Sequence, residues 1–213
     1  MKKSIAAAAT LIAIFAASGC SAPSSGPAVP GSTQSESATN GDGGTPAAPA
    51  EVTYYDNGDL IVGTDIKPGV YRGEVDEGIV ALCTASQTTE AGKVMDIRNA
   101  NEGSVIFTVV NKKGSTATFS GCAHIALAKD VLRKNAKPGN GYFLVGVELA
   151  PGKYSATVDK DSVMKLGTVV QESGKGKVMD IRNANSGKVV FTVKNVKGSV
   201  VSFSGFSKVT KVG

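Results

Sequence analysis

The chain has 213 residues, of which 41% are hydrophobic, and a formal net charge of +5 at pH 7. It has one histidine, which excludes a site built from several histidine ligands. The basic balance is weak and no basic motif interleaved with aromatic residues is present, which argues against nucleic-acid binding. No phosphate-binding loop is present either, so the sequence predicts no cofactor and no metal.

The first nineteen residues have the layout of a bacterial lipoprotein signal. Lys2 and Lys3 precede an apolar run from Ile5 to Ala17, and small residues then lead to Cys20. A run of about 13 residues is too short for a membrane-spanning helix, which needs roughly 20. We therefore predict that residues 1–19 are removed and that Cys20 carries lipid, which anchors the protein to the cell membrane on its extracytoplasmic face. The alternative is an ordinary signal peptide cleaved nearby, with Cys20 as an unmodified thiol.

Residues 20–51 are dominated by Ser, Pro, Gly, Ala and Thr and contain no aromatic residue. A segment of this composition cannot bury enough apolar surface to fold. We predict a disordered linker that spans on the order of 30 Å on average.

The rest of the chain contains an internal duplication. Residues 57–71 match residues 140–154 at an offset of 83, and residues 94–101 recur unchanged as 178–185 at an offset of 84, so one residue is inserted between the two blocks. The sequence predicts two tandem modules joined by a short connector. We place the first module at 52–128, the connector at 129–139 and the second module at 140–213.

Each module has the residue pattern of an all-β fold. Residues 105–110 and 189–193 are rich in β-branched and aromatic residues that alternate with period two. The spacing of turn signals predicts six or seven short strands per copy, arranged as a small antiparallel sandwich or barrel. Only residues 128–135 have a helical pattern.

Two turns are predicted in each copy. The sequences Asn-Lys-Lys-Gly after Val110 and Asn-Val-Lys-Gly after Lys194 indicate hairpins between the strands on either side. The Pro-Gly pairs that end at Gly69 and Gly152 fit type II turns, each followed by a strand through Tyr71 or Tyr154.

Cys83 and Cys122 remain once Cys20 is lipidated. An even number of cysteines in an exported domain predicts a disulfide. The matching positions of the second copy hold Leu166 or Gly167 and Phe206, which indicates apolar packing in place of a bridge. The alternative is a pair of free thiols or of metal ligands.

The string from Leu60 to Tyr71, with the cysteines that follow it, resembles a family of repeat-containing secreted proteins and lipoproteins of high-GC Gram-positive bacteria and their phages. The resemblance covers both copies and implies an anchored β-rich module of unknown ligand. In that family aromatic residues follow the cysteines. Here Thr84 follows Cys83 and Ala123 follows Cys122, so no binding residue carries over.

Few residues suggest chemistry. His124 is one candidate base, but nothing nearby in the sequence supplies a nucleophile and an orienting acid, so a structural histidine is the favoured interpretation. Asp56 and Asp59 suggest a calcium loop, but the spaced ligands of a recognised one are missing and a tight turn fits better.

Asp96 and Arg98 recur as Asp180 and Arg182. Residues two apart on a strand project from the same face, so we predict ion pairs. A role for the arginines in binding a carboxylate or a sugar is the less favoured alternative.

The charge is uneven, because residues 140–213 contain 11 basic and 5 acidic residues, whereas residues 52–128 contain 6 and 9. A basic module outside the membrane is suited to contact with anionic lipid or wall polymer. We predict a membrane-anchored, non-catalytic binding or structural component of the cell envelope, with the membrane as one partner and a wall polymer, glycan or protein as the other. One alternative is a phage- or prophage-encoded envelope factor that excludes superinfecting phage. Another is an extracytoplasmic hydrolase.

Overall fold

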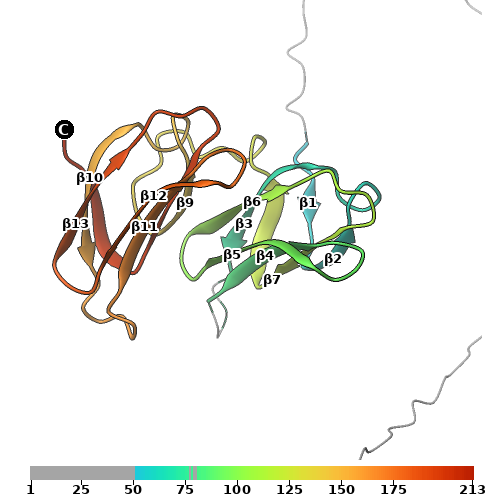
Figure 1. The fold of residues 1–213 in the computed structure, drawn as a ribbon, viewed down its shortest axis with the longest axis horizontal. Coiled ribbons are helices and arrows are strands. Elements are labelled where there is room, and N and C mark those ends of the chain that lie inside the picture. Colours follow the sequence, from blue (N-terminus) through green and yellow to red (C-terminus); the bar gives the residue numbers. More distant parts are fainter. Residues whose placement is uncertain (1–50, 77, 79–80) are drawn as a thin grey trace, which may run out of the picture. The chain divides into compact units, whose positions relative to one another are not determined.

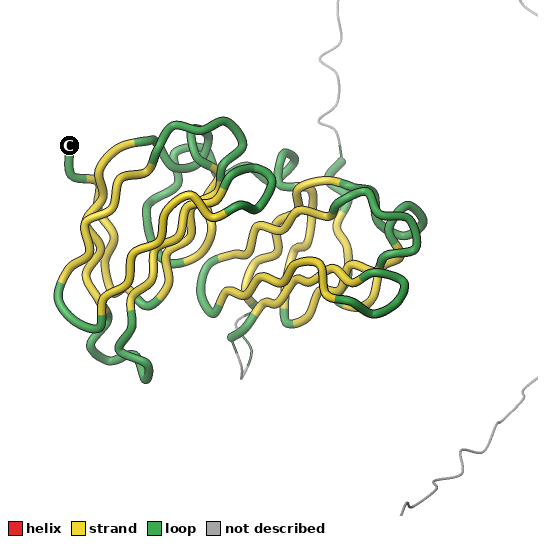
Figure 2. The backbone as a smooth tube through the Cα atoms, in the orientation of Figure 1, coloured by secondary structure: helices red, strands yellow, loops and turns green. Residues whose placement is uncertain are grey.

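The computed structural model describes residues 51–76, 78 and 81–213, which belong to one compact unit. Within these residues the chain forms β-strands joined by loops and turns (Figure 1, Figure 2). No helix that could span a membrane is found in this part of the chain. The predicted signal peptide, Cys20 and the linker up to residue 50 lie outside the described residues.

The first module is a sandwich of two four-stranded antiparallel sheets. The sheets have the strand orders β1-β8-β3-β6 and β2-β7-β4-β5. The strands are β1 (Tyr54–Tyr55), β2 (Gly58–Ile61), β3 (Gly69–Val75), β4 (Cys83–Thr88), β5 (Val94–Ala100), β6 (Ser104–Val109), β7 (Thr116–Ser120) and β8 (Cys122–Leu127).

The second module repeats this arrangement without a counterpart of β1. Its sheets have the orders β13-β10-β15 and β12-β11-β14-β9. The strands are β9 (Gly141–Leu144), β10 (Gly152–Val158), β11 (Gly167–Glu172), β12 (Val178–Ala184), β13 (Lys188–Val193), β14 (Val200–Ser204) and β15 (Phe206–Lys211). The predicted all-β sandwich is confirmed for the described residues, and neither module closes into a barrel.

Each module has its own hydrophobic core between its sheets. Alternate residues of β6, Val105, Phe107 and Val109, point inward as the period-two pattern predicts. Phe107 lies opposite the buried Tyr71 in the register of β3 and β6, and Phe191 lies opposite Tyr154 in the second module. The two tyrosine hydroxyls donate to backbone carbonyls four residues earlier, Tyr71 to Lys67 at 2.7 Å and Tyr154 to Ala150 at 2.6 Å, so neither hydroxyl is buried without a partner.

The inserted residue of the second copy lies in one loop. Val75 and Val158, which end β3 and β10, are related by the offset of 83, whereas Cys83 and Gly167, which begin β4 and β11, are related by 84. The loop from 159 to 166 is therefore one residue longer than its counterpart, and the strands keep their register.

The predicted hairpins after Val110 and Lys194 are wrong. In the first module β6 and β7 belong to different sheets, and so do β13 and β14 in the second. The connection passes from one sheet of the sandwich to the other, because the backbone of residue 110 bonds to a side chain of β4, in the opposite sheet, and not to the strand beside it. The hairpin in each copy is instead β4–β5 or β11–β12.

Two smaller predictions also need correction. Gly69 does not have a positive φ and Gly152 has φ of 142°, far from the value of about +80° in a type II turn, because both residues already begin strands. Residues 128–135 form turns and not a helix. One reason is that both the backbone and the side chain of Arg133 are bound to groups outside this segment.

Candidate functional site

The predicted disulfide between Cys83 and Cys122 is present and lies in the core of the first module. In the second module Phe206 occupies the corresponding place. A Cβ added to Gly167 would lie 2.3 Å from Cε1 of the Phe206 ring, so the glycine makes room for the ring. The predicted apolar replacement of the bridge is confirmed.

A buried ion pair joins the two modules. Arg72 of β3 is 1% exposed, and its guanidinium binds both carboxylate oxygens of Glu148, which lies in the turn between β9 and β10. The Arg72 guanidinium also donates to the Ser104 hydroxyl. Burial lowers the pKa of Arg72, and the charge of Glu148 partly offsets that effect. A buried charge is tolerated only when it is paired, so each module depends on the other here.

Arg133, from the connector, completes this junction. Its backbone N–H donates to Glu148 Oε1 at 3.1 Å, and its guanidinium donates to Ser104 Oγ at 3.0 Å and to the carbonyl of Tyr142 at 3.1 Å. The guanidinium carbon also lies 5.4 Å from the centre of the Phe143 ring. The connector is therefore fixed to both modules.

A second polar cluster of the junction surrounds Arg98 of β5. Arg98 Nε donates to the Asp96 carboxylate at 3.1 and 3.3 Å, and another of its nitrogens pairs with Glu172 of β11. Burial raises the pKa of the neighbouring Tyr142 phenol, and the positive charge of Arg98 opposes that shift. The predicted Asp96–Arg98 pair is confirmed, and it extends to the other module.

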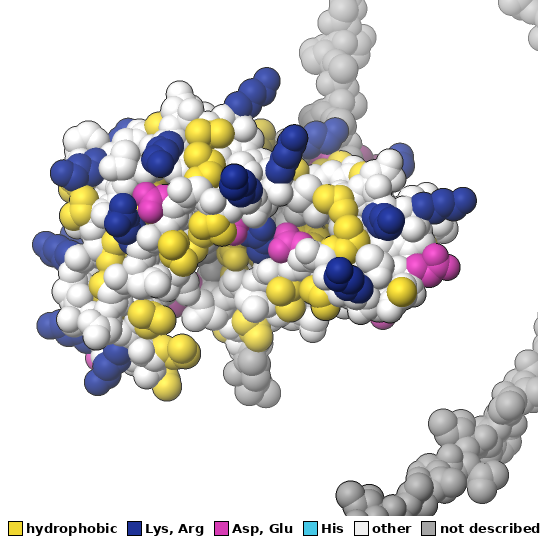
Figure 3. Space-filling view, viewed as in Figure 1, with side chains coloured by type: hydrophobic (Ala, Val, Ile, Leu, Met, Phe, Trp, Pro, Cys, Tyr) yellow, Lys and Arg dark blue, Asp and Glu magenta, His cyan; other side chains and the backbone are white. Residues whose placement is uncertain are grey.

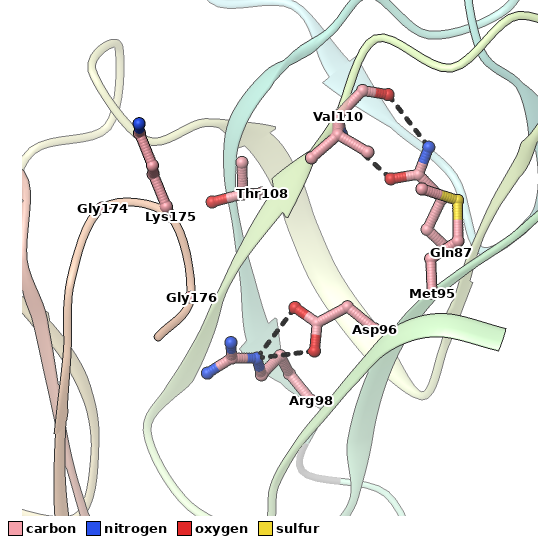
Figure 4. A pocket seen from close by; sticks show the side chains of 9 residues that line it. All are labelled: Gln87, Met95, Asp96, Arg98, Thr108, Val110, Gly174, Lys175 and Gly176. Carbon is pink, nitrogen blue, oxygen red and sulfur yellow. Dashed lines mark hydrogen bonds and ion pairs between the residues drawn. The ribbon is translucent and has the colours of Figure 1, made fainter. Parts of the chain in front are cut away.

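A cavity of about 420 Å³ lies beside this cluster (Figure 4). Asp96 and Arg98 meet on one of its walls, and the tip of the β11–β12 hairpin passes along another (Figure 4). Its lining residues are Gln87, Met95, Asp96, Arg98, Thr108, Val110 and the tip residues Gly174, Lys175 and Gly176. Asp96 and Arg98, the charged β5 residues that border the cavity, are already paired with each other.

One buried glutamine in each module was not singled out from the sequence. Gln87 of β4 accepts from the Val110 N–H at 2.9 Å and donates to the Val110 carbonyl at 3.0 Å and to Ser115 Oγ at 2.7 Å. Gln171 makes the same set of contacts with Lys194 and Ser199. Each glutamine thus bridges the two sheets of its sandwich. Gln87 follows the inward-facing Cys83 and Ala85 at a spacing of two residues, and this alternation was the signal that could have identified it as inward-facing.

His124 and the Asp56–Asp59 segment lie in or beside strands of the first module. His124 sits at a bulge of β8 with φ of 49°, largely exposed, and its Nδ1 lies 3.4 Å from a Glu74 carboxylate oxygen. Asp59 accepts from Thr118 Oγ1 at 2.6 Å. Asn57, between the two aspartates, bonds the backbone of Cys122 through both ends of its amide. In the described part of the chain, no three His, Cys, Asp or Glu side chains gather in a way that could hold a metal ion.

Asp180 and Arg182 pair as predicted, with Arg182 Nε 3.5 Å from Asp180 Oδ1. Unlike Arg98, Arg182 is exposed over 60% of its side chain. The same pair is therefore part of the junction in the first module and lies on the surface in the second.

The loop between β10 and β11 presents apolar side chains to solvent. Val163 is 99% and Met164 76% exposed, with Lys160 and Lys165 beside them. The acidic Asp159 and Asp161 lie in the same loop. Figure 3 shows hydrophobic side chains at the lower end of the second module, with lysine and arginine side chains spread over the face in view. Exposed apolar residues grouped in this way are typical of a contact surface.

Comparisons of this chain with protein-family models, with curated proteins and with solved structures gave no match.

Proposed function

We propose that this chain is a membrane-anchored surface lipoprotein whose two β modules act together as a non-catalytic binding head in the cell envelope. The observation that carries the anchoring is the N-terminal order of Lys2 and Lys3, a short apolar run, small residues and Cys20. Two or more acyl chains on one cysteine give durable attachment, whereas a single chain gives only reversible binding.

The junction supports the binding role. Arg72, Glu148 and Arg133 are committed to fixing one module against the other, and Arg98 is committed to Asp96 and Glu172. Charged groups held by such partners are poorly placed to carry protons or to attack a substrate. They are well placed to present the outer surfaces of two modules in a fixed arrangement.

The outer surface of the second module supports contact with the envelope. It is the basic half of the protein, and its β10–β11 loop exposes Val163 and Met164 between lysines. Lysine next to an anionic surface contributes about 1 kcal/mol per residue that reaches it. An anchored protein with a long linker brings this surface within reach of lipid headgroups and wall polymers.

The test is the intact mass of the protein purified from the membranes of a bacterial host that processes lipoproteins. We expect a mature chain that begins at Cys20 and carries the added mass of diacylglycerol, with or without a third acyl chain. The Cys20→Ala variant should lose the lipid and leave the membrane fraction. An unmodified Cys20 in a membrane-associated mature protein would rule out the proposed anchor.

A further inference from the structure

Each module has an equivalent outer surface on its β5–β6 or β12–β13 side, and the part of the chain that the structure describes covers only one of the two. In the first module this surface, here called the junction face, consists of Val70, Arg72, Arg98, Ser104, Ile106 and Thr108. The matching residues of the second module, here called the open face, are Lys153, Ser155, Arg182, Lys188, Val190 and Thr192. The internal duplication therefore supplies an occupied and an unoccupied version of one surface.

The junction face is covered by the second module. Ile106 points away from the core of its own module, yet it is only 4% exposed. A narrow pocket there is lined by Val70, Ile106 and Thr108 from the first module and by residues 172–174, 176, 198 and 200 from the second. The junction face is thus covered in two parts. Strand β9 and the turn that follows it lie against β6 and Arg72, whereas the β11–β12 hairpin and the start of β14 lie beside Arg98, Ile106 and Thr108.

Two features of that hairpin match Arg98. Glu172 supplies the carboxylate that pairs with the guanidinium. Gly176 allows the close approach, because a Cβ at this position would lie 3.2 Å from Arg98 Nη2, and its φ of 76° favours glycine. A carboxylate followed by a glycine-containing tip is therefore what this face accepts.

The open face has the same arrangement of strands, and none of the described residues, 51–76, 78 and 81–213, covers it. Val190, the counterpart of Ile106, is 53% exposed. β12 and β13 are edge strands of their sheets, like β5 and β6. Figure 1 shows β5 and β6 on the side of the first module nearest the second, and β13 on the far side of the second module. An exposed edge with an apolar residue is a surface suited to pairing with another chain.

The residues that position Arg98 are retained around Arg182. Residues 178–185 are identical to 94–101, and Gln171 and Thr192 match Gln87 and Thr108. Four other positions differ in charge: Lys153 replaces Val70, Lys188 replaces Ser104 and Lys194 replaces Val110, whereas Ser155 replaces Arg72, a net gain of two positive charges. The open face is therefore more basic than the junction face, so its complement has to be more acidic.

We propose that the open face binds a β-hairpin of a partner protein that carries a carboxylate at the end of its first strand, as Glu172 does, followed by a tip that contains glycine. Arg182 receives a carboxylate there as Arg98 receives Glu172, and Val190 is covered as Ile106 is. The inference rests on the proposed binding role and not on the lipid anchor, so the soluble modules test it whether or not Cys20 is lipidated.

A second copy of this chain does not fit the open face. The corresponding hairpin of the first module has Thr88 in place of Glu172, so it lacks the carboxylate at the position that pairs with Arg98, although Glu90 and Gly92 follow in its tip. Its own β11–β12 hairpin is already docked on the junction face. Ser155 also replaces Arg72, so the buried pair that fixes the junction has no counterpart. The occupant is therefore a different protein.

The experiment is a titration of the ¹⁵N-labelled soluble part, from residue 48 onward, which forms one compact unit. The probe is a synthetic hairpin peptide with the sequence of residues 170–179, closed by a terminal disulfide and with its lysines replaced by glutamate. We expect saturable chemical-shift changes at Arg182, Val190 and Thr192 and none at Arg98 or Ile106. A control peptide with glutamine at every glutamate should bind at least about tenfold more weakly.

The matched protein variants are Arg182→Gln on the open face and Lys113→Gln on an exposed loop of the first module. Both remove one positive charge, so a non-specific electrostatic effect would weaken binding equally in both. We expect Arg182→Gln to weaken binding at least about tenfold and Lys113→Gln to leave it unchanged. An unchanged spectrum away from β12 would show that Arg182→Gln remains folded.

Several results would overturn the proposal. These are no shifts at millimolar peptide, shifts centred elsewhere, equal binding of the glutamine control, or equal loss in the two variants. Concentration-dependent shifts at β12 and β13 without any peptide would show that a second copy is the occupant, which would also contradict it.

Discussion

The two modules close their cores differently at one equivalent position. The first joins β4 to β8 through Cys83 and Cys122, whereas the second packs the Phe206 ring over Gly167. A disulfide restricts the unfolded chain, whereas a buried ring stabilises the folded state by removing apolar surface from water. Each sandwich therefore fills this position of its core, the first with a disulfide and the second with an aromatic ring.

The modules also differ in what lies outside their cores. Strand β6 is buried at five of its six residues, whereas β13 alternates strictly between buried and exposed. Because the inward residues of the two strands correspond, the difference comes from the outer faces. The outer face of the first copy packs against the second copy, whereas the equivalent face of the second copy is exposed among the described residues.

The largest expected effect comes from the disulfide. Replacement of Cys83 and Cys122 by serine should lower the free energy of unfolding of the first module by about 4 kcal/mol, since the bridge closes a loop with a sequence separation of 39 residues. Chemical denaturation followed by NMR signals of each module measures this. A reducing agent should have the same effect on the wild-type protein. A loss far below this value would show that the bridge does not stabilise the first module.

The next effect comes from the buried ion pair. Glu148→Gln should cost about 3 kcal/mol, because it leaves the buried Arg72 guanidinium without its counter-charge. The matched control is Asp65→Asn, since Asp65 occupies the same turn position in the first copy and its carboxylate accepts from the Ile61 N–H at an exposed site. Denaturation followed by circular dichroism compares the two variants. Similar small losses in both would show that the pair does not hold the junction.

The smallest effect comes from the buried glutamine that both modules share. Gln87→Leu and Gln171→Leu should each cost about 2 kcal/mol, because each removes the acceptor of the Val110 or Lys194 N–H and the donor to the buried Ser115 or Ser199 hydroxyl. Equal losses, measured by denaturation of the two variants, are expected. A loss in one module alone would mean that the sheet-bridging role of the glutamine is not common to both.

Local patterns were enough to predict much of the fold. Alternation in residues 105–110 predicted an inward-facing strand, and the cysteine count predicted the Cys83–Cys122 bridge. The match of Phe206 to Cys122 predicted the packed replacement. These features depend on residues that are close in sequence or on positions that match between the two copies. Both can be read directly from the sequence.

The pairing of elements could not be predicted in the same way. The connection after Val110 looked like a hairpin because its residues favour a turn, but the partner of the Val110 backbone is the Gln87 side chain, 23 residues away. Arg72 and Glu148 are 76 residues apart and lie in segments whose local patterns are those of ordinary strands and turns. Contacts between distant residues, with no motif of their own, determine the junction.

The buried pair between Arg72 and Glu148 holds the two modules together in one compact unit, from which we expect them to tumble together. The most direct test is ¹⁵N relaxation of the soluble part from residue 48 onward, with the rotational correlation time determined separately for the strands of each module. We predict one common correlation time for the wild-type protein and two shorter, different ones for Glu148→Gln. Separate correlation times in the wild-type protein would contradict the account.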